Sequence, residues 1–348
     1  MRRALRVSVL TVSLAFCLTG CSAAIGASAS QSGPKRYEAT WMDVFDTVTT
    51  VVGYAGSEEE FEARAQEFHD EMVEYHQLYD IYNDYEGVSN IKTINDNAGV
   101  APVEVDERII DLLVFARDMC EATDGKTNAA MGSVTKLWHD ARAAAESDAN
   151  LEGTPPSEDE IAEALTHISF DTIVIDEAAS TVFITDPAQS IDVGSIAKGY
   201  AVEQAASQFD DLLISAGGNV RAAGTKPDGS LWAVGVQNPD GGSEYAAVLN
   251  VTDESVVTSG DYQRYFVSDG VRCHHIIDPD TGYPASLYRS VTIVCPDSGT
   301  ADALSTALFN LPVERGTEVA QAFDAQVLWI FADGSQQMTD GFAALLRD

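Results

Sequence analysis

The spacing of apolar residues changes near residue 172, and this change restricts the chain to a small set of folds. Before it, apolar side chains recur at steps of three and four over 61–79 and 109–120, which predicts amphipathic helices, and a further helix is expected over 158–165. After it come short β-rich runs, of which the first two predict a hairpin: 173–175, 182–184, 212–215, 231–236, 246–251, 290–294 and 327–331. Helices followed mainly by strands predict an α+β fold rather than a regular βαβ alternation.

The N-terminus has the composition of an export signal. Arg2, Arg3 and Arg6 form a basic start, and the apolar run 7–17 is too short to span a bilayer as a finished helix. Leu18-Thr19-Gly20-Cys21 resembles the bacterial lipoprotein processing box, in which the cysteine is lipidated and becomes the new N-terminus. The sequence therefore predicts a lipid anchor on Cys21, with a plain signal peptide as the alternative.

This box divides the chain into three segments. Residues 1–20 are the predicted signal peptide, 21–36 a flexible tether rich in Ala, Ser and Gly, and 37–348 the folded domain. A lipidated Cys21 would attach the protein to the cell membrane, facing the extracytoplasmic side.

The charge balance is strongly acidic. The chain has 55 Asp and Glu against 20 Lys and Arg, a formal charge of −35, spread along its length. Because such a surface repels phosphate backbones, we expect no nucleic-acid partner. Beyond the signal region the cysteines are Cys120, Cys273 and Cys295, with no CxxC pair, so neither a disulfide framework nor a zinc site is predicted.

The segment from Ser190 to Tyr200 is a candidate phosphate site. An apolar strand end meets Gly194, and a helix is expected to begin near Ser195, where free backbone N–H groups suit a phosphate. Lys198 adds a cation, and Asp192 is placed to accept hydrogen bonds from a base or a ribose. A strand–turn–helix with an exposed lysine is the alternative interpretation.

Three further polar segments follow strands: 214–220 with Gly217-Gly218, 257–262, and 274–284 with His274-His275. Paired glycines allow positive φ and close approach of a ligand to the backbone, although a structural turn explains them nearly as well. Adjacent histidines on a strand point to opposite faces, so a shared metal is not expected.

Asp302 and Thr306 stand four residues apart in the predicted helix 300–308 and would share one face of it. A carboxylate and a hydroxyl are hard oxygen donors, which suit Mg²⁺ rather than zinc. The alternative is an aspartate at a helix N-terminus and a threonine bonded to its own backbone.

Six segments together resemble the successive motifs of the FAD:protein FMN transferase family, the ApbE family, in the same order: DVGSIAKGYAVE, ISAGGN, WAVGVQNP, VTSGDYQRYF, HIIDPDTGYP and ADALSTALF. The resemblance covers roughly residues 40 to 335. It implies an ApbE-like α+β fold, with a single catalytic domain, mixed or antiparallel sheets and flanking helices. It also implies Mg²⁺-dependent transfer of FMN from FAD to a Thr or Ser of another protein.

The resemblance assigns roles to residues of the C-terminal half. Asp192, Lys198 and Ile277 match positions that contact the FAD, and His275 matches a histidine that we take as a candidate base. The matches to metal positions are Ser195, Asp302, Ser305 and Thr306, and Asp302 is also a predicted catalytic residue.

The N-terminal half matches less closely. Phe45-Asp46-Thr47 resembles the family's Met-Gly-Thr, which makes Phe45 a predicted FAD contact, and Tyr82 matches a ring-stacking tyrosine that is a second one. Thr127-Asn128-Ala129-Ala130 stands where the family usually has Phe-Asp-Pro-Thr, and Thr127 and Asn128 are the predicted FAD contacts there.

The resemblance therefore predicts a transferase that uses FAD and Mg²⁺ and releases AMP. Its acceptor would be a membrane redox-complex subunit or a secreted flavoprotein. Two alternatives stay open: hydrolysis of FAD to FMN and AMP, and a non-catalytic lipoprotein that binds FAD.

Overall fold

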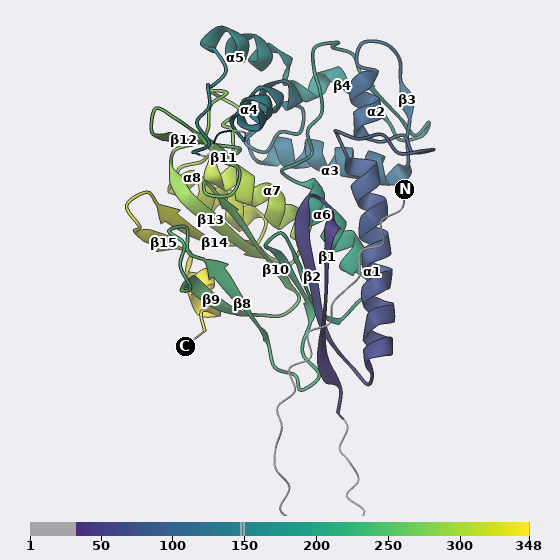
Figure 1. The fold of residues 1–348 in the computed structure, drawn as a ribbon, viewed down its shortest axis with the longest axis vertical. Helices are drawn as coiled ribbons and strands as arrows, with labels where there is room; N and C mark the ends of the chain where they lie inside the picture. Colours follow the sequence, from purple (N-terminus) through teal and green to yellow (C-terminus); the bar gives the residue numbers. More distant parts are fainter. Residues whose placement is uncertain (1–32, 147, 149, 348) are drawn as a thin grey trace, which may run out of the picture. The chain divides into compact units, whose positions relative to one another are not determined.

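The centre of the computed structural model is an eight-stranded sheet in which all neighbouring strands are antiparallel (Figure 1). Its strands, in spatial order, are β1 (Lys35–Val44), β2 (Thr47–Ala55), β6 (Asp211–Ala216), β7 (Asn219–Gly224), β10 (Glu254–Gly260), β13 (Tyr288–Cys295), β14 (Gln326–Phe331) and β15 (Gln336–Met338).

The structure describes residues 33–146, 148 and 150–347. The predicted signal peptide and Cys21 lie outside these residues. From Pro34 onward the chain clusters into one compact unit, and no helix in its described part is long and apolar enough to cross a membrane. Strand β1 begins at Lys35, so two residues that the sequence places in the tether, Lys35 and Arg36, are strand residues.

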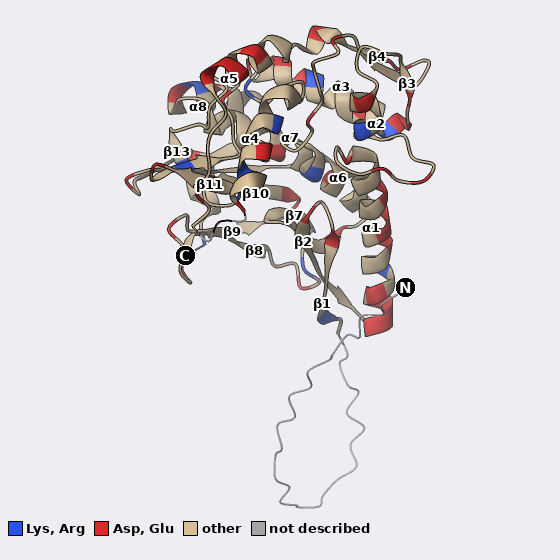
Figure 2. Ribbon diagram, turned by 45° about the horizontal axis from the view of Figure 1, so that its top comes forward, with Lys and Arg blue, Asp and Glu red and all other residues tan. Residues whose placement is uncertain are grey.

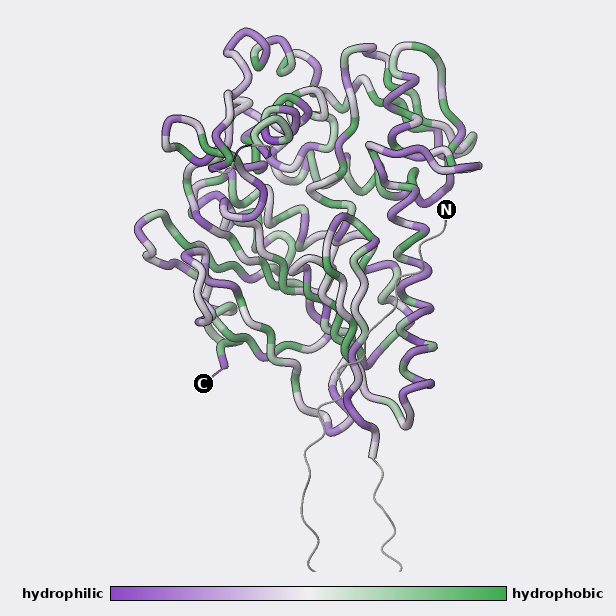
Figure 3. Tube along the Cα trace, viewed as in Figure 1, coloured by the Kyte–Doolittle hydropathy of each residue, from purple (hydrophilic) through white to green (hydrophobic). Residues whose placement is uncertain are grey.

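Helices cover one face of this sheet. They are α1 (Glu58–Tyr79), α6 (Ala197–Ala206), α7 (Ser298–Phe309) and α8 (Val313–Ala322). Helix α1 lies along β1 and β2, whereas α7 lies across β10 and β13 and packs against α6 (Figure 1). The main hydrophobic core fills this interface, and apolar residues gather along these inner segments in Figure 3.

The opposite face of the sheet is covered by a separate hairpin, β8 (Trp232–Gln237) and β9 (Tyr245–Val251), and by α9 (Asp340–Leu345). Strand β8 alternates between buried and exposed residues because only one of its faces is covered. Strand β13 is buried at almost every residue, since helices lie on one side of it and the hairpin layer on the other.

The remaining elements lie beyond one end of the sheet. One group consists of α2 (Ile91–Asp96), α3 (Glu107–Ala122), and a three-stranded sheet of β3 (Val103–Glu104), β5 (Thr181–Ile184) and β4 (Ile173–Asp176). The other consists of α4 (Gly132–Ala145), α5 (Glu158–Ala164), β11 (Tyr265–Ser268) and β12 (Val271–His274), with a core of its own around Trp138 and Phe266. Two short 3₁₀ helices, Leu165–His167 and Phe170–Thr172, join the groups.

The predicted α+β fold is confirmed, and each helix and strand expected from the spacing of apolar residues has a counterpart. The β1–β2 hairpin at the sheet edge was not predicted. Its strand β1 mixes charged and apolar residues, and its turn, Phe45-Asp46, lacks the Asn-Gly or Gly-Gly signal of a tight hairpin.

The start of α6 is held directly against α7. The amide of Gly199 donates to Oδ2 of Asp302 at 2.8 Å, so Asp302 accepts one of the free N–H groups of the first turn of α6. A Cβ atom on Gly199 would lie 2.3 Å from the carbonyl oxygen of Ser298 and 2.5 Å from Cβ of Asp302. The two helices can approach this closely only because residue 199 has no side chain.

We therefore expect Gly199→Ala to destabilise the protein by about 1–3 kcal/mol, the usual cost of forcing an extra methyl group into a packed contact. Chemical denaturation measures the change. Gly33→Ala is the control, because no atom lies within 4 Å of its added Cβ, and its stability should stay within about 0.5 kcal/mol of the wild type. Equal stability of the two variants would contradict the contact.

Candidate active site

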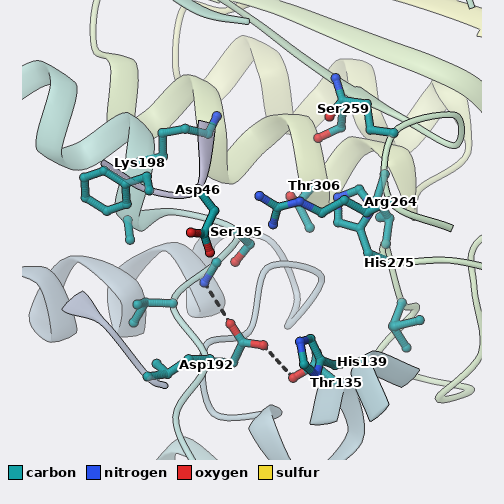
Figure 4. A pocket seen from close by; sticks show the side chains of 18 of the residues that line it. Asp46, Thr135, His139, Asp192, Ser195, Lys198, Ser259, Arg264, His275 and Thr306 are labelled. Atoms are coloured by element: carbon teal, nitrogen blue, oxygen red, sulfur yellow. Dashed lines mark hydrogen bonds between the residues drawn. The ribbon is translucent and has the colours of Figure 1, made fainter. Parts of the chain in front are cut away.

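A cavity of about 570 Å³ opens at one end of the large sheet. Its walls are formed by the β1–β2 and β6–β7 turns, the loop after β10, the segment before α6, and parts of α4, α7 and β12. Elements from both halves of the chain therefore meet around one space, and Figure 4 shows side chains from these elements turned toward it.

Most of the residues that the sequence singles out line this cavity: Phe45, Tyr82, Asn128, Asp192, Ser195, Lys198, His275, Ile277, Asp302 and Thr306. Two lie one layer behind the wall. The hydroxyl of Thr127 donates to the carbonyl of Ala303 in α7. The hydroxyl of Ser305 is fully buried, donates to the carbonyl of Asp302 and is 2.8 Å from the hydroxyl of Ser259.

The segment before α6 is held from two sides. Asn95 pairs with the backbone of Ile191, accepting its N–H at 2.7 Å and donating to its carbonyl at 2.9 Å. One oxygen of Asp192 accepts from the hydroxyl of Thr135 at 2.6 Å and the other from the amide of Gly194 at 2.9 Å (Figure 4). The carboxylate of Asp192 is thus fixed at the cavity wall.

Lys198 lies in the first turn of α6 and faces the cavity. Its ammonium donates to Oδ1 of Asn219, the buried first residue of β7. Burial lowers the pKa of Lys198, the Asp302 carboxylate opposes this shift, and the Arg264 guanidinium adds to it. The Nδ2 donor of Asn219 is buried and has no partner among the described residues, so the same wall keeps a spare hydrogen-bond donor.

The two adjacent histidines differ in environment. His274 is buried, with its Nε2 2.8 Å from the carbonyl of Ala285 and its Nδ1 accepting from the amide of Ile276. The ring of His275 lines the cavity, and the backbone of Arg264 lies within hydrogen-bonding reach of it. The side chain of His275 is exposed within the cavity, yet desolvation by the surrounding protein, followed by the Arg264 guanidinium, lowers its pKa to about 3. A neutral His275 can accept a proton.

Known proteins with similar sequences and structures share this arrangement of elements. A sequence model of the ApbE family matches residues 43–331. The FAD:protein FMN transferase of Treponema pallidum is 36% identical over 282 residues, covering 74% of this chain and 75% of that protein. The one from Klebsiella pneumoniae is 34% identical over 241 residues, 66% of this chain and 70% of that protein. The crystal structure of the ApbE protein of Thermotoga maritima has a TM-score of 0.78 at 32% identity, covering 90% of this chain and all of that one.

The chain belongs to the ApbE family. The match to the family spans most of the described residues and includes every element that lines the cavity. The resemblance found from the six motifs is thereby confirmed.

This ApbE protein also brings together cations that the sequence motifs did not single out. The cavity is lined by Lys126, Arg142 and Arg264 in addition to Lys198. These four cationic side chains equal in number the four carboxylates that also line the wall. Elsewhere acidic residues predominate, as the scatter of red along the helices of Figure 2 shows. Arg264 lies inside the VTSGDYQRYF segment, and Arg142 lies one helical turn after Trp138 on α4, but neither position carries a pattern that predicts a ligand contact.

The loop 127–130, whose sequence differs from the usual Phe-Asp-Pro-Thr of the family, is held in its conformation by hydrogen bonds of Asn128. The side-chain oxygen of Asn128 accepts the amide of Ala130 at 2.9 Å, and its Nδ2 donates to the carbonyl of Ile168 at 3.0 Å. A carboxylate could make the first bond but not the second. Lys126, next to this loop, donates to Asp278 at 2.6 Å and to Asp280 at 2.8 Å, which ties the loop to the turn that follows His275.

Tyr82 lies at the cavity with 54% of its surface exposed. Its ring is stacked on that of His139 from α4, with 5.1 Å between centroids. One face of the tyrosine is thus already occupied, and a flat ligand would stack on the other face or displace His139.

Hard oxygen donors line one side of the cavity. Within the residues that the structure describes, no three His, Cys, Asp or Glu side chains converge on a common metal position. Asp302 and Thr306 lie on successive turns of α7, and neither Oδ1 of Asp302 nor the hydroxyl of Thr306 bonds to a described residue. Such a sparse set fits a cation that takes its remaining oxygens from water and substrate phosphates, as Mg²⁺ does.

Replacing Arg264 by Gln should raise the pKa of His275, because a nearby positive charge that disfavours the imidazolium is removed. NMR titration of the His275 ring measures this pKa. The matched variant Arg272→Gln, which removes a guanidinium from the neighbouring strand β12, should leave it nearly unchanged. An unaltered titration in Arg264→Gln would show that the two groups do not interact.

Proposed function

We propose that this chain transfers FMN from FAD to a Ser or Thr hydroxyl of an acceptor flavoprotein and releases AMP. The observation that carries the proposal is the cavity itself. In a chain with a formal charge of −35, it gathers four cations, a neutral histidine and unpartnered oxygen donors in one place. The names of the relatives from Treponema pallidum and Klebsiella pneumoniae support the same activity.

The reaction exchanges one phosphorus–oxygen bond for another. The acceptor oxygen forms a bond to the FMN-side phosphorus of FAD, the bond from that phosphorus to the bridging oxygen breaks, and AMP leaves with the electron pair. The hydroxyl proton must be removed, and negative charge increases on the phosphoryl and leaving oxygens. A site for this reaction needs a base and fixed positive charge.

His275 is the proposed base. Its pKa of about 3 keeps the ring neutral at physiological pH, and a neutral imidazole that donates from one nitrogen to the Arg264 backbone can accept the hydroxyl proton on the other. The phosphates of a bound FAD would raise that pKa, since negative charge stabilises the imidazolium, and would make His275 a stronger base when substrate is present.

Lys198, Arg142 and Arg264 are the proposed phosphate contacts. Lys198 stands at the start of α6, where the helix dipole also favours negative charge. Burial and then the nearby Arg264 guanidinium lower the pKa of Arg142, whereas Glu146 opposes this shift. An anion between the cations would relieve this repulsion. Asp192 is the proposed acceptor for ribose or flavin N–H and O–H groups.

Asp302, Thr306 and the backbone at Ser195 are the proposed ligands of Mg²⁺. When bound, the ion supplies Lewis-acid stabilisation of phosphoryl oxygens. Asp302 presents one oxygen to the cavity while the other bonds the amide of Gly199, so its orientation is set by the α6–α7 contact.

Incubation with FAD, Mg²⁺ and a candidate acceptor, followed by in-gel flavin fluorescence, tests the activity. We expect Asp302→Asn to lower flavin transfer at least about a hundredfold, as removal of a charge-stabilising group does elsewhere. Its amide oxygen still accepts from Gly199, so its stability should stay within about 1 kcal/mol of wild type, whereas Asp302→Ala also loses that bond.

The products separate the alternatives. Free FMN and AMP without labelled acceptor would favour hydrolysis, and FAD binding without either product would favour a non-catalytic binder. Full transfer by Asp302→Asn at low Mg²⁺ would remove Asp302 from the proposed metal site.

We also propose that the protein acts outside the cytoplasm, attached to the cell membrane through Cys21. The basic start, the short apolar run and the box that ends at Cys21 support this location. Mass spectrometry of the mature N-terminus should then show a diacylated or triacylated cysteine. Cys21→Ser should be released from the membrane fraction, and a mature protein that begins at another residue would exclude the anchor.

A further inference from the structure

The turn between β1 and β2 adopts an unfavourable backbone conformation at the cavity wall. Val44 pairs with Thr47, which leaves a two-residue turn of Phe45 and Asp46. Both have positive φ, 52° and 49°, a region that bulky residues such as phenylalanine rarely occupy. Strained backbone of this kind persists only where surrounding contacts hold it, and such positions concentrate at functional sites.

His76, near the end of α1, makes the contacts that hold this turn. The amide of Phe45 lies 3.2 Å from Nδ1 of His76, and the two rings meet edge to face with centroids 5.5 Å apart. Because the amide can only donate, Nδ1 must be the acceptor and the ring proton must lie on Nε2. His76 also lines the cavity, directly behind the turn.

A second bond fixes the orientation of the His76 ring. Nε2 lies 3.2 Å from the hydroxyl oxygen of Tyr85, and that hydroxyl donates to Asp80 at 2.7 Å. The other oxygen of Asp80 accepts the amides of Tyr82 and Asn83. Burial opposes ionisation of Asp80, but the bond from Asn83 and these other bonds lower its pKa, so it remains a charged acceptor.

These hydrogen bonds form a relay that runs from Phe45 through His76 and Tyr85 to Asp80. The relay joins two walls of the cavity that are far apart in sequence. At one end it holds Phe45 and Asp46, and Figure 4 shows Asp46 reaching into the same space as Lys198 and Ser195. At the other end it holds the loop that carries Tyr82. Among the described residues only His76 bonds the amide of Phe45, while the Val44–Thr47 strand pair closes the base of the turn.

We propose that His76 is a positioning residue: as a neutral imidazole it locks the Phe45–Asp46 turn in its left-handed conformation and so completes the wall against which FAD binds. In this role His76 acts through the turn and not on the reacting atoms or the phosphates. The inference rests on the proposed function only for the identity of the ligand.

Two substitutions at His76 that differ in the position of one oxygen test whether its hydrogen bond to Phe45 holds the turn. The side-chain oxygen of His76→Asn falls near the position of Nδ1 and can accept from Phe45, whereas that of His76→Gln falls near the position of Nε2 and cannot. We expect His76→Gln and His76→Ala to weaken FAD binding about three- to tenfold, the effect of one lost hydrogen bond, and His76→Asn to stay close to wild type. Fluorescence quenching measures FAD binding, and KM for FAD should rise more than kcat falls.

Amide hydrogen exchange at Phe45 is the readout that does not depend on FAD. Exchange should accelerate in His76→Gln and His76→Ala and remain slow in His76→Asn. If the Gln and Asn variants have the same FAD affinity and Phe45 exchange rate, or if Phe45 exchanges at the wild-type rate in both, the positioning role of His76 is refuted. A wild-type protein that binds no FAD would refute the proposed function, while the exchange result would still decide the role of His76.

Tyr85→Phe gives an independent check if substitutions at His76 prevent folding. It leaves the Phe45 bond in place and removes only the group that orients the ring. We expect faster Phe45 exchange than in wild type, with an effect smaller than that of His76→Gln. Wild-type exchange in this variant would show that the relay does not hold the turn.

Discussion

The arrangement of the site depends on the contact between the start of α6 and the first turns of α7. Gly199 donates its amide to Asp302, and the absence of a side chain at position 199 lets the two helices touch. Lys198 precedes Gly199, and Thr306 lies one turn after Asp302, so the same contact places a cation and two oxygen donors on one wall. A small displacement between these helices would therefore alter the geometry of several functional groups together.

The second constraint is electrostatic. An acidic surface keeps the protein soluble but repels a dinucleotide with two phosphates. The cavity counters this repulsion locally by drawing Lys126, Arg142, Lys198 and Arg264 from four separate elements. The wall also carries carboxylates, but those of Asp80, Asp192 and Asp302 are held by bonds to neighbouring backbone groups. Lys126 is paired with Asp278 and Asp280, whereas Arg264 makes no ion pair with a described residue and is the cation best placed to meet an anionic ligand.

The sequence allowed prediction of the fold class and of the parts of the site that lie close together along the chain. Asp302 and Thr306 follow from helical spacing, and Asp192 and Lys198 from a strand that gives way to a helix. Arg142 and Arg264 reach the cavity only through tertiary packing, so local spacing does not distinguish them from surface arginines. His76 was missed for a similar reason, since in sequence it is one polar residue on a helix, and its partner lies 31 positions earlier in an unpredicted turn.

Strand β1 runs from the point where the chain enters the folded domain to the wall of the cavity. It enters the sheet at Lys35 and leaves at Val44, next to the cavity, and ten extended residues span about 30 Å. Any attachment that precedes Lys35 therefore joins the far end of this strand. With the anchor proposed above, the chain would enter the folded domain at the end of β1 opposite the cavity rather than at the cavity mouth. The mouth would then be free of the point of attachment, which would leave it open to a bulky acceptor domain.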